Sequence, residues 1–222
     1  MSADSTAGVF VLGGIHQSHE EATLYTYERM GQVYRHLKPD ILAVECLQEY
    51  IEDSSFRGMP FDFKRDMLPL AVEDEIPVYG IDWWDETRGA EWQALQMEAY
   101  NDSVMQCEYA LLGGMFQLLN SYFCEKDFRD INADEITAIW SAMNELKYSI
   151  LRRSPGYREI AVFEEERNDQ IVNNIMNVLA QHPGKRVLVA VGIDHKYYIE
   201  RVLRERGVNV LSVEEVLQSW WE

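Results

Sequence analysis

Residues 9–20 read VFVLGGIHQSHE, an apolar run that ends in two glycines and a histidine. A run of β-favouring residues that is too short for a helix and is closed by glycines predicts a buried strand followed by a turn. A similar stretch, RVLVAVGIDH, occupies residues 186–195 near the other end of the chain. Each predicted strand therefore ends in a G-x-x-H sequence, which places His16 and His195 at strand ends.

Strand-like and helix-like segments alternate through most of the chain. Alternation of this kind predicts an α/β fold, in which a mostly parallel sheet is flanked by helices and joined by right-handed crossovers. The predicted elements are strands at 9–14, 41–45, 76–81, 186–191 and 209–213, and helices at 20–37, 63–75, 160–181 and 195–206.

A helical pattern over residues 86–155 is too long for a simple crossover. Gly113 and Gly114 are expected to break or kink its first helix, and Asn132, followed three residues later by Glu135, is expected to cap its second helix. We interpret this region as a helical insertion within one domain that spans all 222 residues. It would lie over the carboxyl edge of the sheet as a cap, and an arm that forms a homodimer is the alternative.

The chain is strongly acidic, with a net charge of -18 and a pI near 4.6. Such a surface repels phosphate backbones and anionic lipids, so neither nucleic acid nor membrane is an expected partner, whereas divalent cations are favoured. Residues 1–8 lack the basic and apolar parts of a signal peptide, and no apolar run reaches the roughly 18 residues of a membrane span. Three widely spaced cysteines fit reduced thiols, and we therefore expect a cytoplasmic protein.

Polar side chains gather at the predicted strand ends. Because parallel strands share a carboxyl edge, residues that follow them can converge although they are distant in sequence. Two imidazoles with carboxylates suit manganese, cobalt or zinc, and a bound metal would acidify a water molecule whose proton a carboxylate accepts. The residues concerned are His16, His19, Glu45, Asp82, Asp194 and His195, with Arg167 nearby on the helix at 160–181.

Structural roles are the alternatives for most of these side chains. His16 could cap a helix or bond a carbonyl, and Glu45 could form a structural ion pair with Arg167. Asp82 and Asp194 could each cap the helix that follows.

For three other histidines and one cysteine we expect no role in the site. His19, His36 and His182 are expected to be exposed to solvent. Cys46 is expected to face away from Glu45 on its strand and to be an inert thiol.

Four short sequences resemble the TraB/PrgY and Tiki family within the wider EreA/ChaN-like group: GGIH at 13–16, VEC at 44–46, ERN at 166–168 and VGIDH at 191–195. The family has such motifs in the same order. The resemblance implies an α/β fold with its site at the strand ends. Tiki-type relatives imply a metal-dependent protease, erythromycin-esterase-like relatives imply a metal-free histidine and glutamate pair, and the ChaN-like branch implies haem binding.

We therefore predict a hydrolase that cleaves an ester or amide bond, in a peptide or a small molecule, with water activated by a divalent metal. His16, Glu45 and His195 would hold manganese, cobalt or zinc, and Arg167 would stabilise negative charge beside Glu45 and His195. One alternative is a metal-free esterase that uses His16 and Glu45. The other is a protein that binds a peptide, haem or small molecule under the helical cap.

Overall fold

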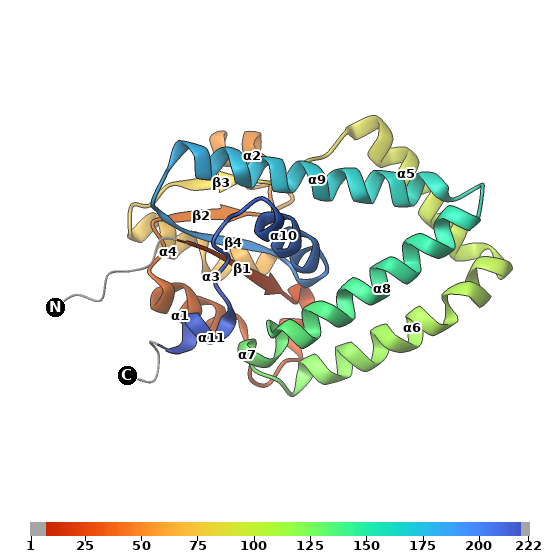
Figure 1. Cartoon of the computed structure of the whole chain (residues 1–222), viewed down its shortest axis with the longest axis horizontal. Helices are drawn as coiled ribbons and strands as arrows, with labels where there is room; N and C mark the ends of the chain where they lie inside the picture. The colour runs from red at the N-terminus through yellow and green to blue at the C-terminus, as the bar shows by residue number, and fades with distance from the viewer. Residues whose placement is uncertain (1–7, 219–222) are drawn as a thin grey trace.

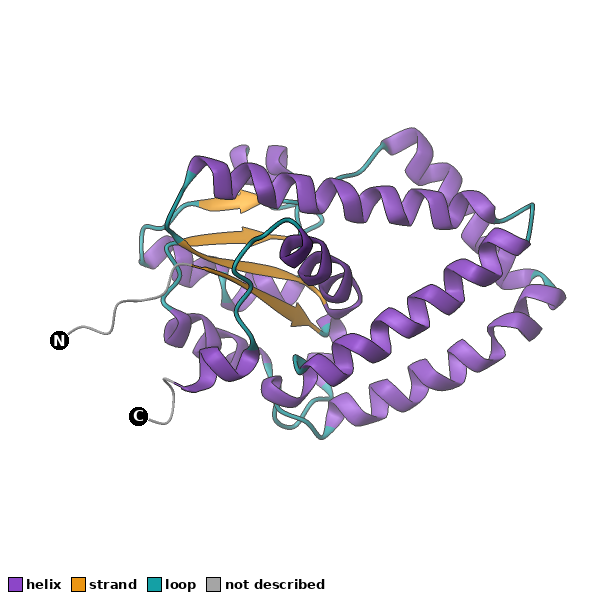
Figure 2. Ribbon diagram, viewed as in Figure 1, coloured by secondary structure: helices purple, strands orange, loops and turns teal. Residues whose placement is uncertain are grey.

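Four short strands build one sheet in which every neighbouring pair is parallel (Figures 1 and 2). The computed structural model describes residues 8–218, so residues 1–7 of the segment examined for a signal peptide lie outside it. The chain has the predicted α/β fold. The strands are β1 (Gly8–Gly14), β2 (Ile41–Val44), β3 (Val78–Gly80) and β4 (Arg186–Gly192), in the spatial order β1-β4-β2-β3.

The two strands that precede the G-x-x-H sequences are neighbours in the sheet. β1 and β4 pair over their whole lengths, with Gly14 opposite Gly192. The fifth predicted strand, at 209–213, is wrong, because this segment makes only one bridge, between Val9 and Val210. Ser212 and Glu215 bond each other's backbone N–H groups in a capping box, which starts α11 (Val213–Gln218) and ends the extended segment.

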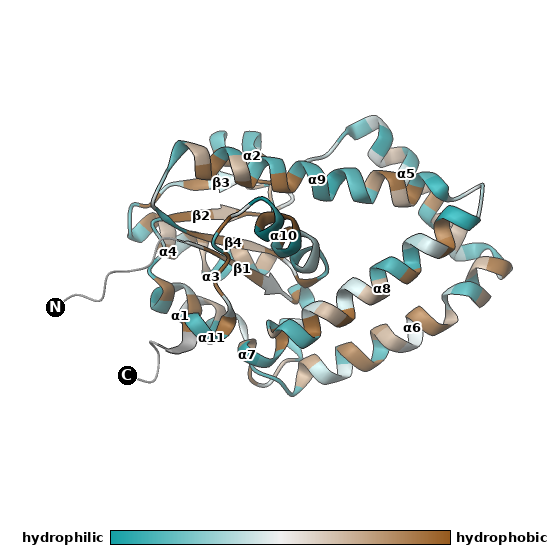
Figure 3. Cartoon of the chain, in the orientation of Figure 1, coloured by the Kyte–Doolittle hydropathy of each residue, from teal (hydrophilic) through white to brown (hydrophobic). Residues whose placement is uncertain are grey.

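Helices cover both faces of the sheet because alternate strand residues point to opposite sides. One face packs on α1 (Tyr27–Leu37), α3 (Phe61–Asp66) and α4 (Leu68–Glu73). The other packs on α9 (Arg158–Gln181) and α10 (Ile193–Glu205). Figure 3 shows the brown, apolar strands between helices of mixed colour.

The helices in the first half of the chain are shorter than predicted. The helix expected at 20–37 is replaced by the short 3-10 helix η1 (His16–Glu20) and by α1, which begins where the Thr26 side chain accepts a hydrogen bond from the Arg29 N–H. The helix expected at 63–75 is divided into α3 and α4 around Met67. Pro69, the second residue of α4, has no N–H to continue a helix from α3. A further short helix, α2 (Gln48–Glu52), follows β2.

Residues 86–153 form helices that extend beyond the carboxyl ends of the strands (Figure 1). The expected break at Gly113 and Gly114 is wrong, since both lie inside one continuous helix. The break falls at Asp102, whose carboxylate accepts from the N–H groups of Val104 and Met105 and so starts the second helix. The elements are α5 (Glu86–Asn101), α6 (Ser103–Cys124), α7 (Phe128–Ile131) and α8 (Asp134–Arg153).

Asn132 joins this helical region to β1 instead of capping α8. Its Oδ1 accepts from the Gly13 N–H at 2.7 Å, and its Nδ2 donates to the Phe128 carbonyl at 3.1 Å. The capping prediction is wrong because the buried backbone of β1 uses the same side chain, and Ala133 takes the capping position. A Cβ at Gly13 would lie 2.3 Å from Ile193 Cδ1, so a larger residue here would force the Ile193 side chain to shift.

Within residues 8–218 no helix combines the length and the apolar character needed to cross a membrane.

Candidate functional site

Arg167 joins the ends of β2 and β3. Its Nε and Nη2 donate to the two carboxylate oxygens of Asp82 at 2.8 and 2.9 Å, and Nη2 also donates to Glu45 Oε1 at 3.0 Å. The second oxygen of Glu45 accepts from the Gly192 N–H at 2.7 Å. The ion pair between Glu45 and Arg167 is therefore present. Asp82 does not cap α5, because Asp85 has that role.

The ring of His195 is held by Asn168, a buried residue that follows Arg167 on α9. His195 Nδ1 and Asn168 Oδ1 are 2.6 Å apart, and because an amide oxygen only accepts, Nδ1 is the donor. In the neutral ring the lone pair is then on Nε2. That atom lies 3.4 Å from Arg167 Nη1 and 3.8 Å from Glu45 Oε1. Glu45, Arg167 and His195 thus converge, as the sequence predicts.

His16 lies on the other side of this edge, beside a buried carboxylate that the sequence does not reveal. His16 Nδ1 is 3.3 Å from Asp62 Oδ1, and His19 Nε2 is 3.4 Å from Asp62 Oδ2. The exposed position expected for His19 is wrong: the residue is 2% exposed, and its Nδ1 lies 2.6 Å from the Tyr25 carbonyl oxygen. The 3-10 helix after β1 directs the His19 ring inward, and the Ile15 N–H donates a hydrogen bond to its Nε2.

Asp62 makes His16 a cation at neutral pH. Burial lowers the pKa of His16, but the hydrogen bond and charge of Asp62, together with the charges of Glu45 and Asp194, outweigh it and raise the pKa to about 9. Burial likewise raises the pKa of Asp62, but the hydrogen bond and the positive charge of His16 outweigh it and hold that pKa below its usual range.

The raised pKa of His16 predicts a stability that depends on pH. Between pH 6.5 and about 9, folded protein keeps a proton on His16 that unfolded protein releases. The free energy of unfolding should therefore fall as the pH rises through this window. Urea unfolding at both ends of the window should show this fall in the wild type and a smaller one in His16→Gln. Equal falls in the two proteins would contradict the assignment.

Asp194 lies between the two histidine positions. A Cβ on Gly192 would lie 2.6 Å from Asp194 Oδ1, 2.7 Å from His16 Nε2 and 3.5 Å from Glu45 Oε2, so these atoms meet above Gly192. Asp194 does not cap α10, because Gly192 is the capping residue and no side chain bonds the helix start.

Asp194 as a residue is exposed, and among residues 8–218 its carboxylate has no hydrogen bond or ion pair. Desolvation by the surrounding protein raises its pKa, but the charges of His195, His16, Lys147 and Arg167 outweigh this and lower the pKa. Asp194 is therefore an ionised side chain that is free to meet a ligand.

Three cavities adjoin Asp194. The first, of about 140 Å³, is also lined by Arg167 and His195. The second, of about 240 Å³, is also lined by His16. The third, of about 600 Å³, lies between the helices of the 86–153 region and α9. Asp194 lines all three cavities, and His16, Arg167 and His195 each line one of them.

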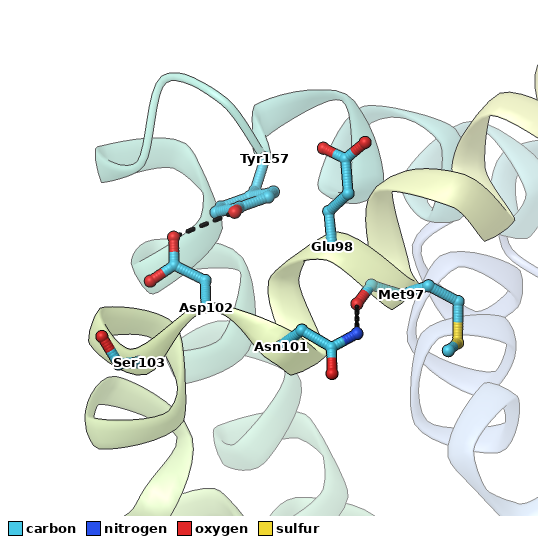
Figure 4. A pocket seen from close by; sticks show the side chains of 6 residues that line it. All are labelled: Met97, Glu98, Asn101, Asp102, Ser103 and Tyr157. Atoms are coloured by element: carbon cyan, nitrogen blue, oxygen red, sulfur yellow. Dashed lines mark hydrogen bonds between the residues drawn. The ribbon is translucent and has the colours of Figure 1, made fainter.

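A separate hollow of about 610 Å³ lies at the junction of α5 and α6, away from the strand ends (Figure 4). Asp102 uses one oxygen to cap α6 and accepts from the Tyr157 hydroxyl with the other at 2.9 Å. Both carboxylate oxygens of Asp102 therefore already accept hydrogen bonds, from the start of α6 and from Tyr157, and we assign this hollow a structural role.

The remaining histidines and Cys46 have structural contacts. The exposed positions expected for His36 and His182 are wrong, because both residues are partly buried. Nε2 of His36 lies 3.0 Å from the Val216 carbonyl oxygen. Nε2 of His182 lies 2.6 Å from the Tyr79 hydroxyl. Cys46 is buried, and desolvation raises the pKa of its thiol to about 11, as an inert thiol requires.

The predicted metal ligands do not form a metal site in their present arrangement. In the described part of the chain, no group of three or more His, Cys, Asp or Glu side chains is placed to hold a metal ion. Both oxygens of Glu45 already accept hydrogen bonds, and the Arg167 guanidinium lies within hydrogen-bond distance of both Glu45 and His195. These residues therefore fit a guanidinium better than a metal, and metal binding stays a prediction.

No protein-family model matches the chain, and neither the curated proteins nor the solved structures contain a match. The resemblance to the TraB/PrgY and Tiki family therefore stays a hypothesis that rests on the four short motifs.

Proposed function

We propose that the protein hydrolyses an ester or amide bond with a water molecule activated by His195. The observation that carries the proposal is the contact between His195 Nδ1 and Asn168 Oδ1 at 2.6 Å. It keeps the proton on Nδ1 and leaves the lone pair on Nε2, which lies 3.4 Å from Arg167 Nη1. A water molecule that takes the place of Nη1 at this lone pair would give up its proton to Nε2. Glu45 Oε1, 3.8 Å from Nε2, would stabilise the imidazolium that forms.

The neighbouring charges have complementary roles in this proposal. His16 carries a proton at neutral pH and would donate it to the leaving group or to a developing oxyanion. Arg167 would hold Glu45 in place through their 3.0 Å hydrogen bond. Asp194, which has no partner among the described residues, would orient the attacking water.

A metal-dependent hydrolase is the second candidate. It is favoured by the approach of His16 Nε2, Asp194 Oδ1 and Glu45 Oε2 to one point above Gly192, since these are ligand atoms for borderline divalent cations. A metal there would have to displace the proton of His16 and the Gly192 N–H from Glu45.

Chelation separates the two candidates. Protein purified without a histidine tag would be analysed for metals by mass spectrometry and assayed on chromogenic esters and peptide amides, before and after treatment with EDTA. We expect turnover to persist without stoichiometric metal. Turnover that EDTA abolishes and manganese, cobalt or zinc restores would overturn the metal-free proposal. Absence of turnover in every condition would overturn both and leave the binding protein.

A further inference from the structure

The largest cavity at the site is an apolar chamber with a polar floor. Its volume of about 600 Å³ falls in the range of small-molecule binding sites. Helices α5, α6, α8 and α9 form its walls, and Asp194 of α10 lies at its floor. Its apolar lining includes Tyr109, Leu112, Phe116, Trp140, Met143 and Ile160.

The charges on the chamber walls are already neutralised. Lys147 Nζ lies 2.5 Å from Glu164 Oε2, and the other oxygen of Glu164 accepts from Trp92 Nε1 and Gln96 Nε2. Among the described lining residues, Asp194 is the one charged side chain without such a partner. A ligand in the chamber thus meets apolar walls and, at the floor, a single free negative charge.

We propose that the chamber binds the apolar arm, acyl or aromatic, of a neutral ester or amide whose carbonyl group reaches the floor beside Asp194 and His195. The inference rests on the proposed hydrolase and adds its substrate class. Burial of an apolar arm stabilises the complex in proportion to the area removed from water. An anionic substrate would be repelled by Asp194 and by the net charge of -18.

Two adjacent glycines of α6 provide a test and its control. Gly113 lines the chamber, whereas Gly114 does not, and a Cβ on either would meet no atom within 4 Å. Leucine is a better helix former than glycine, so Gly113→Leu and Gly114→Leu should both fold. Only the first places new side-chain volume at the chamber wall.

The reaction test compares p-nitrophenyl acetate, butyrate and octanoate. In the wild type, kcat/KM should rise by about fourfold for each added methylene until the chamber is full. Gly113→Leu should lower kcat/KM for octanoate by at least about tenfold more than it lowers kcat/KM for acetate. Gly114→Leu should behave as the wild type. No rise with chain length, or an equal loss on acetate and octanoate in Gly113→Leu, would overturn the proposal.

A binding measurement separates failure of this proposal from failure of the proposed function. N-phenyl-1-naphthylamine, a neutral apolar fluorophore, should bind wild type and Gly114→Leu and bind Gly113→Leu at least about tenfold more weakly. Such binding in a protein without esterase activity would support the chamber and overturn the hydrolase. Ester turnover without any binding of the fluorophore would support the hydrolase and overturn the chamber.

Discussion

His195→Ala should lower kcat for ester hydrolysis by about 10²–10⁴-fold, the usual contribution of a general base. The Nε2 lone pair that Asn168 orients is lost in this variant, and none of the neighbouring groups takes its place. Glu45 is held by Arg167 and the Gly192 N–H, and His16 is already protonated at neutral pH. The measurement is steady-state kinetics on the best chromogenic ester, with circular dichroism to verify folding.

Two further variants make this test specific. His182→Gln removes a histidine that contacts Tyr79 away from the site and should leave kcat unchanged. Asn168→Ala should lower kcat less than His195→Ala, because the base remains but its tautomer and orientation are no longer fixed. Unchanged turnover in His195→Ala would show that this imidazole is not the base.

Arg167→Met should lower the free energy of unfolding by about 3–5 kcal/mol, because removal of one partner leaves buried charges uncompensated. The side chains of Arg167, Glu45 and Asp82 are 20%, 11% and 15% exposed, so water screens them poorly. The measurement is urea unfolding at neutral pH.

The controls for this variant come from the same chain. Arg153→Met breaks a pair with Glu108 in which the two side chains are 64% and 47% exposed, and should cost no more than about 1 kcal/mol. Adding Glu45→Gln and Asp82→Asn to Arg167→Met should recover part of the loss, since the orphaned charges disappear. A loss in Arg167→Met no larger than that in Arg153→Met would show that the cluster does not stabilise the fold.

The parallel sheet and part of the site follow directly from sequence patterns. β1 and β4 are apolar runs closed by glycine, and the residue after each such run must lie at the shared carboxyl edge. Glu45 and His195 are therefore predicted to lie close together. Arg167 is predicted to lie near them, because a helix that precedes a parallel strand begins at that edge, and the structure brings the three side chains together.

The rest of the site depends on tertiary contacts that leave no periodic signal. Asp62 follows an irregular loop, and its position beside His16 and His19 arises only when α3 packs on η1. Asn132 and Glu135 have the spacing of a capping box. The sequence does not show that the Asn132 side chain bonds the backbone of β1 instead. Asn168 was detectable as a neighbour of Arg167 in the ERN motif, although nothing in the sequence shows which ring it holds.

Because β4 lies between β1 and β2, the sheet cannot form until β4 has been synthesised. Among the four strands of the sheet, β1 pairs with β4, and β4 separates it from β2. During synthesis, a nascent chain that ends before residue 186 already contains His16 and Glu45. It lacks β4, so the edges of the apolar strands β1 and β2 that pair with β4 in the finished sheet are still unpaired. Such edges are templates for aggregation. The last long strand to leave the ribosome is therefore the one that both brings the residues of the candidate site together and protects the growing chain.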